Sequence, residues 1–338
     1  MTKTPTFANR VLNWWQTHGR HDLPWQIERT PYRVWLSEIM LQQTQVVTVV
    51  PYFQRFVARF PELSDLAAAE LDEVMALWSG LGYYARARNL HAAARVCLQL
   101  HDGQLPECPE ALRELPGIGE STANAIIAQA HNRRAPILDG NVKRVLARHA
   151  AIAGWPGKAA VLRKLWAEAE QRTPPDHARD YTQAIMDLGA MVCRRTRPAC
   201  CDCPVAGDCQ ARARGVVEKL PERRKPRPRP RHSTRLVVME DSQGRILLER
   251  RPPAGIWGGL WSLPELDDDR QPATATQLAS IEHHFTHFVL DIHPVKVSVS
   301  RPSELADGQH RQWLSPNEAL SCGLPRPVRQ IIESLIEP

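Results

Sequence analysis

Two short segments of this chain carry residues that could bind an anion and hold a carboxylate. Residues 115–122 read Leu-Pro-Gly-Ile-Gly-Glu-Ser-Thr, and Gly117 and Gly119 allow a tight turn just before a predicted helix. The free N–H groups of that helix start would face the turn, where a phosphate is a natural ligand. Residues 138–142 place Asp139 at the start of another predicted helix, where an aspartate is a common cap.

A second carboxyl group, Glu38, lies among apolar and neutral amide side chains in residues 34–44. Such surroundings raise the pKa of a carboxyl group, which can then stay protonated near neutral pH and act as a general acid. The alternative is a surface glutamate near a helix start. For Asp139 the alternative is a simple cap, although amides donated to it would also keep it ionised. One protonated and one ionised carboxyl group form the pair that cleaves glycosidic bonds.

Five of the eight cysteines crowd into residues 193–209. In an intracellular protein this crowding argues for metal binding more than for disulfides. Cys193, Cys200, Cys203 and Cys209 are separated by six, two and five residues, so only one pair is close. Zinc and an iron–sulfur cluster both remain open. Four ligands within one short loop favour the cluster.

The elements that must position these residues are mainly helices. Apolar residues recur at helical spacing through residues 8–218, punctuated by proline and glycine, which predicts an all-α unit of about ten helices. A chain of 338 residues is long enough for two domains. No apolar run would span a membrane and residues 1–20 lack a signal-peptide pattern, so we expect an intracellular protein of the cytoplasm or nucleoid.

A segment rich in proline and arginine is expected to separate the two domains. Residues 219–231 hold seven Lys or Arg against one Asp or Glu, and their alternating prolines prevent a regular helix. This excess equals the net charge of the whole chain, +6. It suits a polyanionic partner, although a solvated linker would have the same composition. We predict a basic linker over residues 219–233.

The pattern after the linker predicts a mixture of strands and helices. Residues 234–239 and 245–249 flank a turn at 241–244, which is typical of a β-hairpin. Further strands are expected at 287–292 and 295–299, and a closing helix at 328–336. The second domain, residues 234–338, is therefore predicted to be α+β.

The glycine turn, Asp139 and the four-cysteine loop together resemble the helix-hairpin-helix DNA glycosylases of the endonuclease III superfamily. Within that superfamily the chain is similar to the adenine DNA glycosylase (MutY) family. The segments that carry the resemblance are residues 35–46, 80–90, 115–119, 138–142 and 186–190, and, in the second domain, 257–261 and 285–287. The resemblance implies a multi-domain protein with an all-α glycosylase domain (residues 1–218), the linker, and a smaller Nudix-like domain.

The resemblance also implies a reaction: removal of adenine mispaired with 8-oxoguanine or guanine, in base excision repair. Glu38 would protonate the flipped adenine, at N7, so that the base leaves. Asp139 would stabilise the oxocarbenium ion, electrostatically or as a transient covalent partner, and Asn141 would help orient the reacting groups. Gln183 would lie against the extruded adenine.

Further residues acquire expected roles from the same resemblance. Gln43, Leu81 and Tyr83 would fill or wedge the duplex around 8-oxoguanine; for Leu81 and Tyr83 the alternative is core packing. The four cysteines would bind a [4Fe–4S] cluster. Double-stranded DNA would be the partner of a monomeric protein, with other repair or replication proteins as further partners.

Ser121 departs from those superfamily members that also cut the DNA backbone. They carry a lysine at this position, whose amine forms a Schiff base with the sugar. A hydroxyl cannot form that imine, so we predict a monofunctional glycosylase that uses water. Lys143 is nearby in sequence, and a weak lyase activity through it stays open.

The second domain resembles the Nudix fold but lacks the paired glutamates with which Nudix hydrolases hold magnesium. Residues 267–269 are expected to form a solvated loop. Phe285, Thr286 and His287 would instead face 8-oxoguanine. Thr286 stands where the family often has serine; both hydroxyls can donate a hydrogen bond.

Two other functions stay open from the sequence. One is a glycosylase for oxidised pyrimidines that also cuts the strand, against which Ser121 and the second domain both argue. The other is a DNA-binding protein without enzymatic activity, in which the cysteine loop serves structure or redox sensing. Such a protein would have no need of Glu38.

Overall fold

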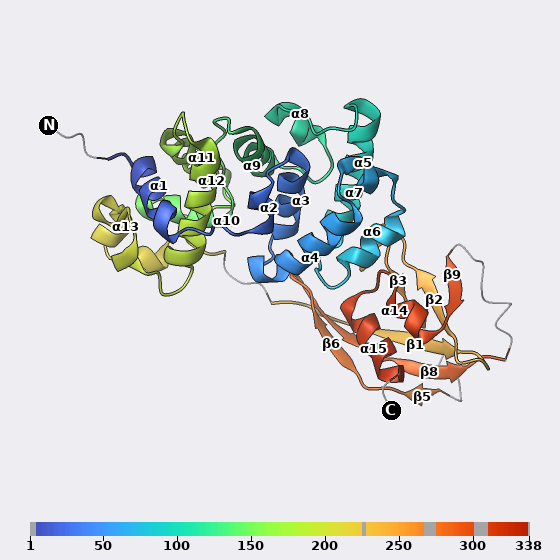
Figure 1. Ribbon diagram of the computed structural model, residues 1–338. Helices are drawn as coiled ribbons and strands as arrows, with labels where there is room; N and C mark the ends of the chain where they lie inside the picture. The colour runs from blue at the N-terminus through green and yellow to red at the C-terminus, as the bar shows by residue number, and fades with distance from the viewer. Residues whose placement is uncertain (1–4, 225–227, 267–274, 301–309, 337–338) are drawn as a thin grey trace. The chain divides into compact units, whose positions relative to one another are not determined.

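The computed structural model describes residues 5–224, 228–266, 275–300 and 310–336 (Figure 1). The chain folds into two compact units. The first, here the helical unit, comprises residues 1–67 and 92–225, and the second, here the mixed unit, comprises residues 68–91 and 226–338. Among the described residues, no helix combines the length and apolar character needed to cross a bilayer.

The helical unit confirms the predicted all-α domain. Its α-helices are α1 (Phe7–His18), α2 (Pro24–Ile27), α3 (Pro31–Leu41), α4 (Val46–Arg59), α5 (Leu63–Ala68), α8 (Pro109–Glu114), α9 (Glu120–His131), α10 (Gly140–His149), α11 (Ala159–Arg172), α12 (Ala178–Asp187) and α13 (Gln210–Ala213). Shorter turns are η1 (Leu188–Val192), η2 (Cys200–Asp202), η3 (Ala206–Asp208) and η4 (Val217–Lys219). Helix α7 (Ala85–Leu100) contributes to both units.

The apolar run 34–47 is divided between two helices. Thr30 caps α3 by accepting a hydrogen bond from the Arg33 amide (3.3 Å), and Pro31 suits the first helical position. The run is interrupted after Leu41 by a loop in which Gln43 has a φ of 57°, in the left-handed region. Glu38 consequently lies on the last turn of α3, beside this loop, and not near a helix start.

The buried core of the helical unit joins helices that are far apart in sequence. Val11 of α1, Leu146 of α10, Leu165 of α11 and Ala184 of α12 are completely buried in one cluster. Packing of amphipathic faces, more than the propensity of single residues, accounts for most of the stability of such helices. The cluster fixes α10 and α12, which carry Asp139 and Gln183, against each other.

The mixed unit contains the predicted strands and closing helix. Its elements are α6 (Leu71–Trp78), β1 (Arg231–Glu240), β2 (Ile246–Arg250), β3 (Trp261–Ser262), β4 (Glu265–Leu266), β5 (Thr276–Gln277), β6 (Ile281–His284), β7 (Val289–Ile292), β8 (Val295–Ser298), β9 (Arg311–Leu314), α14 (Pro316–Leu320) and α15 (Arg326–Ile336). The hairpin turn places Glu240 opposite Ile246, as predicted. Residues 267–269, expected to be a solvated loop, lie outside the described residues.

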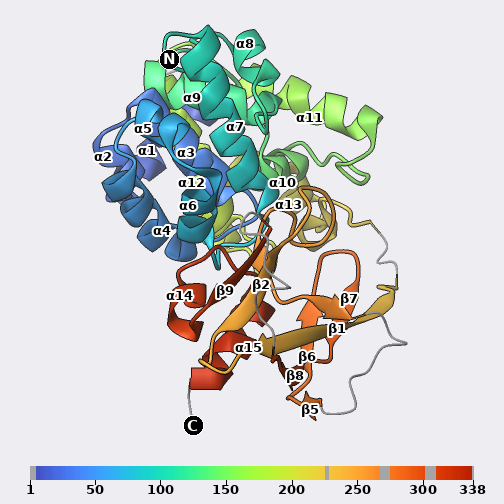
Figure 2. The same cartoon turned by 90° about the vertical axis from the view of Figure 1, so that its right-hand side faces the viewer.

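Strand β1 is the centre of the sheet (Figure 2). It runs parallel to β7 over its first residues and parallel to β8 over its last, and it pairs antiparallel with β2 and β4. The strand begins at Arg231, inside the predicted linker 219–233. There the Arg231 guanidinium donates to Asp291 (2.5 Å) and Glu282 (2.5 Å), which ties the end of the proline-rich segment to the sheet.

Residues 68–91 belong by their contacts to the mixed unit. Leu324 supplies a backbone carbonyl that accepts hydrogen bonds from Ser79 Oγ (3.0 Å) and Tyr84 Oη (3.3 Å). Gly323 lies so close to Met75 that an added Cβ would stand 3.1 Å from it. The predicted boundary at residue 218 therefore marks the change in sequence pattern. By packing, however, the helical residues 68–91 belong with the sheet.

Candidate active site and cysteine loop

Helices α9 and α10 of the helical unit begin differently: α9 has no side-chain cap, and α10 has one. Gly117 has a φ of 81°, which glycine adopts without strain, and Gly119 precedes α9 with no side-chain cap. Both glycines are exposed, so the first amides of α9 are presented to solvent. Helix α10 instead is capped by Asp139, whose Oδ1 accepts a hydrogen bond from the Val142 amide (2.7 Å).

One cavity of about 840 Å³ collects the predicted catalytic residues of the helical unit. Sequence reasoning could not show whether the two carboxyl groups meet. In the structure this cavity is lined by Glu38, Gln43, Ser121, Asp139, Asn141 and Gln183, together with Arg20, Trp25, Arg144, Arg194 and Arg195. The arginines among the lining residues carry the positive charge that attracts a DNA backbone.

Glu38 has the electrostatic surroundings expected of a general acid. Burial, and next the charge of Asp139, raise its pKa to about 7, and a hydrogen bond from Gln129 opposes the shift. Gln129 is itself buried and donates from Nε2 to Oε1 of Glu38 (2.8 Å). Glu38 therefore exchanges its proton in the neutral range, where proton transfer is most effective.

Asp139 behaves differently from the expectation based on its cap. Burial raises its pKa above the ordinary value, and this outweighs the amides of Val142 and Asn141 and the charges of Arg144 and Lys143, which lower it. The local sequence indicates the amide donors of Asp139 but not its burial. The two carboxyl groups thus line one cavity in which burial disfavours the ionised form of each.

Asn141 is held by an arginine that also contacts the start of the cysteine loop. Arg144 donates to Asn141 Oδ1 (2.8 Å), to the Gly189 carbonyl (2.6 Å) and to the Cys193 carbonyl (2.7 Å). A Cβ on Gly189 would stand 2.6 Å from Cβ of Asn141, so only glycine allows this approach of η1 to α10.

Gln183 is oriented by a buried carboxylate. Its Nε2 donates to Asp187 Oδ1 (2.8 Å), and Asp187 also accepts from Trp15 Nε1 (3.1 Å) and from the backbone and guanidinium of Arg20. Asp187 is completely buried. The amide plane of Gln183 at the cavity wall is therefore set by an ion pair behind it.

Ser121 joins the two motifs on which the sequence argument began. Its Oγ accepts a hydrogen bond from the Leu138 amide (2.9 Å), so the first turn of α9 is fastened to the residue before Asp139. The hydroxyl lines the same cavity as Glu38 and Asp139. A reactive amine at this position would face the same space.

The four predicted cysteine ligands line a second cavity. Cys193, Cys200, Cys203 and Cys209 all contribute to it, beside Arg148. Burial and the neighbouring thiols raise the pKa of Cys203 to about 11. Over the described ranges, no group of three or more His, Cys, Asp or Glu side chains is disposed to hold a single metal ion.

Arg148 fixes the first of these cysteines. Its side chain is 2% exposed and donates to Cys193 Sγ (3.3 Å), to the Arg194 carbonyl (2.7 Å) and to the Leu220 carbonyl (2.9 Å). The positive charge of this guanidinium next to Cys193 Sγ can balance the negative charge of a group that thiolates bind. The donor set and its charge therefore fit a group held by four thiolates.

In the mixed unit, Tyr83 lies next to Thr286. Tyr83 has a φ of 49° and is 48% exposed, and its Oη stands 3.5 Å from Thr286 Oγ1. Leu81 is buried, with 6% of its surface exposed. Leu81 is therefore covered in this structure, and a contact with DNA would require it to become exposed, whereas Tyr83 is already accessible.

The other predicted recognition residues surround a small aromatic group. The ring of Phe285 stacks on that of Phe288 with centroids 4.3 Å apart, and His287 meets Phe288 at 4.8 Å. Phe288 is buried, whereas Thr286 and His287 are exposed. The buried ring holds the turn so that the hydroxyl and the imidazole face outward.

Three residues of the site escaped the sequence argument: Gln129, Arg144 and Asp187. Gln129 had one signal, an amide side chain inside the apolar run of α9. Buried polar groups need partners, so such an amide points to a polar group across the interface. Arg144 and Asp187 follow sequence motifs but gave no sign of their distant partners.

The chain is similar to known proteins over both of its units. Residues 36–171 match the HhH-GPD superfamily base excision DNA repair protein model and residues 235–334 match the NUDIX domain model. The adenine DNA glycosylase of Buchnera aphidicola subsp. Acyrthosiphon pisum (strain APS) is 36% identical over 97% of this chain and 97% of its own length. The human adenine DNA glycosylase is 35% identical over 79% of this chain and 58% of its own length.

Solved structures resemble the helical part. A thermostable thymine-DNA glycosylase superposes with a TM-score of 0.55 at 27% identity, covering 62% of this chain and 95% of that one. Endonuclease III in a non-covalent DNA complex gives a TM-score of 0.53 at 20% identity, over 62% of this chain and 94% of that one, and shows the same fold.

The match to the base excision DNA repair model and the similarity to named glycosylases identify the chain as a DNA glycosylase of base excision repair, a hydrolase that acts on DNA. The similarity to an adenine DNA glycosylase over nearly the full length of both chains identifies the family within this class. The chain belongs to the adenine DNA glycosylase family.

Proposed function

We propose that this enzyme removes adenine from duplex DNA where the adenine is paired with 8-oxoguanine or guanine, and that it leaves the backbone uncut. The observation that carries the proposal is the cavity in which Glu38, with a pKa of about 7, stands with Asp139. The family supplies the choice of adenine. A base inside a duplex must be flipped out to reach such a cavity.

The reaction needs one proton donor and one anion. Glu38 donates its proton to N7 of adenine, and the C1′–N9 bond breaks with its electron pair leaving on the base. Asp139 stabilises the positive charge that develops on the sugar. Water adds to C1′, and its proton returns to the Glu38 carboxylate. Asn141 and Gln183 hold the sugar and the base for these steps.

The recognition of the opposite base is assigned to the mixed unit and the α3–α4 loop. Tyr83, Thr286 and His287 offer exposed hydrogen-bonding groups and Phe285 an aromatic face. Gln43 is exposed on the loop beside the cavity. Gly117 and Gly119 present the bare amides of α9 to a phosphate of the bound strand.

We also propose a [4Fe–4S] cluster on Cys193, Cys200, Cys203 and Cys209. The four thiols line one cavity beside the buried guanidinium of Arg148. When bound, such a cluster crosslinks the loop through four thiolates. The role given to it here is structural: it holds residues 193–209 against α10.

The test is incubation with a duplex that carries adenine opposite 8-oxoguanine, followed by alkali. An alkali-labile site at the adenine is expected, and its absence would reject the proposal. A duplex with adenine opposite thymine is the matched control. Without alkali the strand should stay largely intact, since Ser121 supplies no amine.

The strand-cutting alternative is tested by borohydride trapping of a covalent protein–DNA adduct. Wild-type enzyme should trap little or none, and Ser121→Lys should trap more, because its amine would enter the same cavity. Trapping by wild-type enzyme at the rate of base release would favour the alternative. Lesion binding without any base release would favour a non-enzymatic protein.

A further inference from the structure

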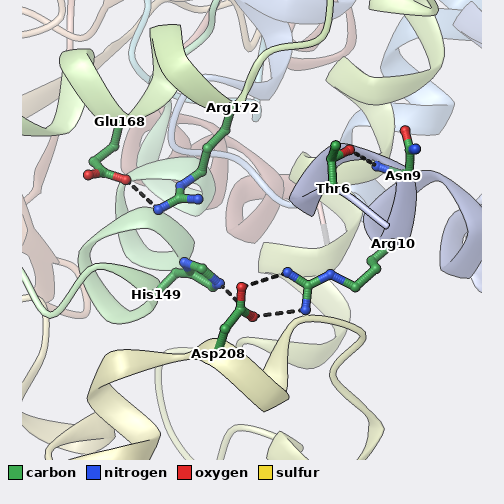
Figure 3. Close-up of polar contacts among 7 residues, drawn as sticks. All are labelled: Thr6, Asn9, Arg10, His149, Glu168, Arg172 and Asp208. Atoms are coloured by element: carbon green, nitrogen blue, oxygen red, sulfur yellow. Dashed lines mark hydrogen bonds and ion pairs between the residues drawn. The ribbon is translucent and has the colours of Figure 1, made fainter. Parts of the chain in front are cut away.

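The residue just before the last cysteine of the loop is held by two distant helices. Asp208 accepts hydrogen bonds from both terminal nitrogens of Arg10, at 2.8 and 2.7 Å, and stands 3.1 Å from Nε2 of His149 (Figure 3). Arg10 belongs to α1 and His149 ends α10. The residue that precedes Cys209 is thus tied to the first helix of the chain.

The helix that supplies Arg10 is itself well anchored. Phe7 is buried, and its ring meets that of His149 edge-on with centroids 4.8 Å apart. The guanidinium of Arg172 lies 4.9 Å from the centre of the Phe7 ring, and Arg172 pairs with Glu168 (2.6 Å). Arg10 therefore projects from a helix that cannot shift without disturbing α10 and α11.

The start and the end of the cysteine loop are held by different means. At the start, buried Arg148 and neighbouring Arg144 both donate hydrogen bonds to the carbonyl of Cys193. At the end, η3 stops at Asp208, and the contact with Arg10 is partly exposed, with 24% of the arginine and 52% of the aspartate side chain accessible. The contact between Arg10 and Asp208 has two points, so it restricts rotation as well as distance.

We propose that Arg10 is a positioning residue for the cysteine loop: by fixing Asp208 it holds Cys209 in place, and α1 thereby closes the loop around its cluster. The inference rests on the proposed [4Fe–4S] cluster. A loop that opens first at Cys209 releases its iron from that side. Restricting this opening slows iron loss, while the chemistry at Glu38 and Asp139 takes place elsewhere in the unit.

The test measures how fast the full-length protein loses iron to a chelator, followed by the decay of its visible absorbance. Arg10→Ala and Asp208→Asn should each accelerate the loss by about three- to tenfold, which is the range expected for a partly exposed two-point ion pair. The double variant should be no faster than Asp208→Asn alone, because that substitution already removes the contact with Arg10.

Two controls separate positioning from general stability. Glu170→Gln breaks the exposed pair between α11 and Arg134 (2.5 Å), which contributes to neither the Phe7 anchor nor the loop, and it should lose iron at the wild-type rate. Arg10→Lys keeps the charge but has one point of contact, so its rate should fall between wild type and Arg10→Ala. This milder variant also keeps the test valid if Arg10→Ala folds poorly.

The outcomes distinguish the two proposals. Wild-type protein that contains iron, with variants that lose it at the wild-type rate, would overturn the role of Arg10 alone. An equal acceleration in Glu170→Gln would overturn it as well. Wild-type protein without iron would overturn the cluster and, with it, the inference built on it.

Discussion

The cavity of the helical unit and the Phe285–His287 turn of the mixed unit are built in opposite ways. In the cavity, Glu38 and Asp139 are partly buried, and this burial raises their pKa values. In the turn, Thr286 and His287 are exposed and only the aromatic rings behind them are packed. The first region controls the charge of its groups, and the second presents groups to a partner.

This difference separates chemistry from recognition. Changes in the cavity should lower the rate of base release whatever base is opposite. Changes in the turn should alter which opposite base is preferred and leave the rate on the weaker substrate nearly unchanged.

The largest effect is expected from Glu38→Gln. The amide cannot protonate adenine, so the single-turnover rate should fall by about 10³-fold or more, near the upper range for loss of a general acid. Binding to the mismatched duplex should persist, since the amide has nearly the same shape. Glu168→Gln, far from the cavity along the chain, is the control. Retained turnover in Glu38→Gln would show that Glu38 is not the general acid, and the cavity would no longer be distinguished from the turn by its chemistry.

A nearly equal loss is expected from Asp139→Asn. Asparagine is as good a helix cap as aspartate, so α10 should keep its start and the protein its fold. The lost charge should lower the rate by about 10²- to 10³-fold, as for other groups that stabilise a transition state. Circular dichroism checks the fold, and single-turnover kinetics measure the loss. A full rate with a neutral side chain would reduce Asp139 to its capping role.

The pH dependence gives a further test of the cavity. Glu38 must be protonated, so the rate should decline about tenfold per pH unit above its pKa of about 7. Asp139 must be ionised, so the rate should also fall as the pH drops through its raised pKa. A profile that is flat between pH 6 and pH 9 in single-turnover experiments would contradict the assignment of Glu38.

The free energy of unfolding should also depend on the protonation of Glu38. The pKa of Glu38 is about 7 in the folded state and 4.5 in the unfolded state. The resulting stabilisation of the folded state is complete below pH 4.5 and is lost as the pH rises through about 7. Glu38→Gln does not titrate, so above pH 7 it should be more stable than wild type by on the order of 1–3 kcal/mol. Chemical unfolding of both proteins at pH 5 and pH 8 measures the change.

The sequence predicts those parts of the structure that depend on local backbone chemistry. The turn at Gly117 needs a positive φ, Asp139 caps the helix that follows it, and Asp241 accepts the amides of Gln243 and Arg245 in the hairpin turn. Each of these features is encoded within about five residues, so residue types alone reveal it.

The contacts that complete the site join residues far apart in the chain. Gln129 reaches Glu38 across 91 positions, and Arg20 reaches Asp187 across 167. No periodicity specifies which helix faces will meet, and the assignment of residues 68–91 to the mixed unit has the same cause. The burial that raises the pKa of Asp139 is also a consequence of this packing.

The smallest effects are expected at the recognition turn. Thr286→Ala removes a hydroxyl from the exposed pair with Tyr83, and one hydrogen bond of this kind corresponds to about a three- to tenfold change. The preference for 8-oxoguanine over guanine opposite adenine should fall by that factor, while the rate opposite guanine stays nearly constant. Thr276→Ala, an exposed threonine of β5, is the matched control.

The pair with Tyr83 allows a stricter version of the same test. If Tyr83 Oη and Thr286 Oγ1 act on one group of the opposite base, Tyr83→Phe and Thr286→Ala should be coupled, and the double variant should lose less than the product of the single losses. Independent losses would mean that the two hydroxyls contact different groups. A loss of rate that is equal on both mispairs would show that the turn serves the chemistry too, and that the two regions are not divided as proposed.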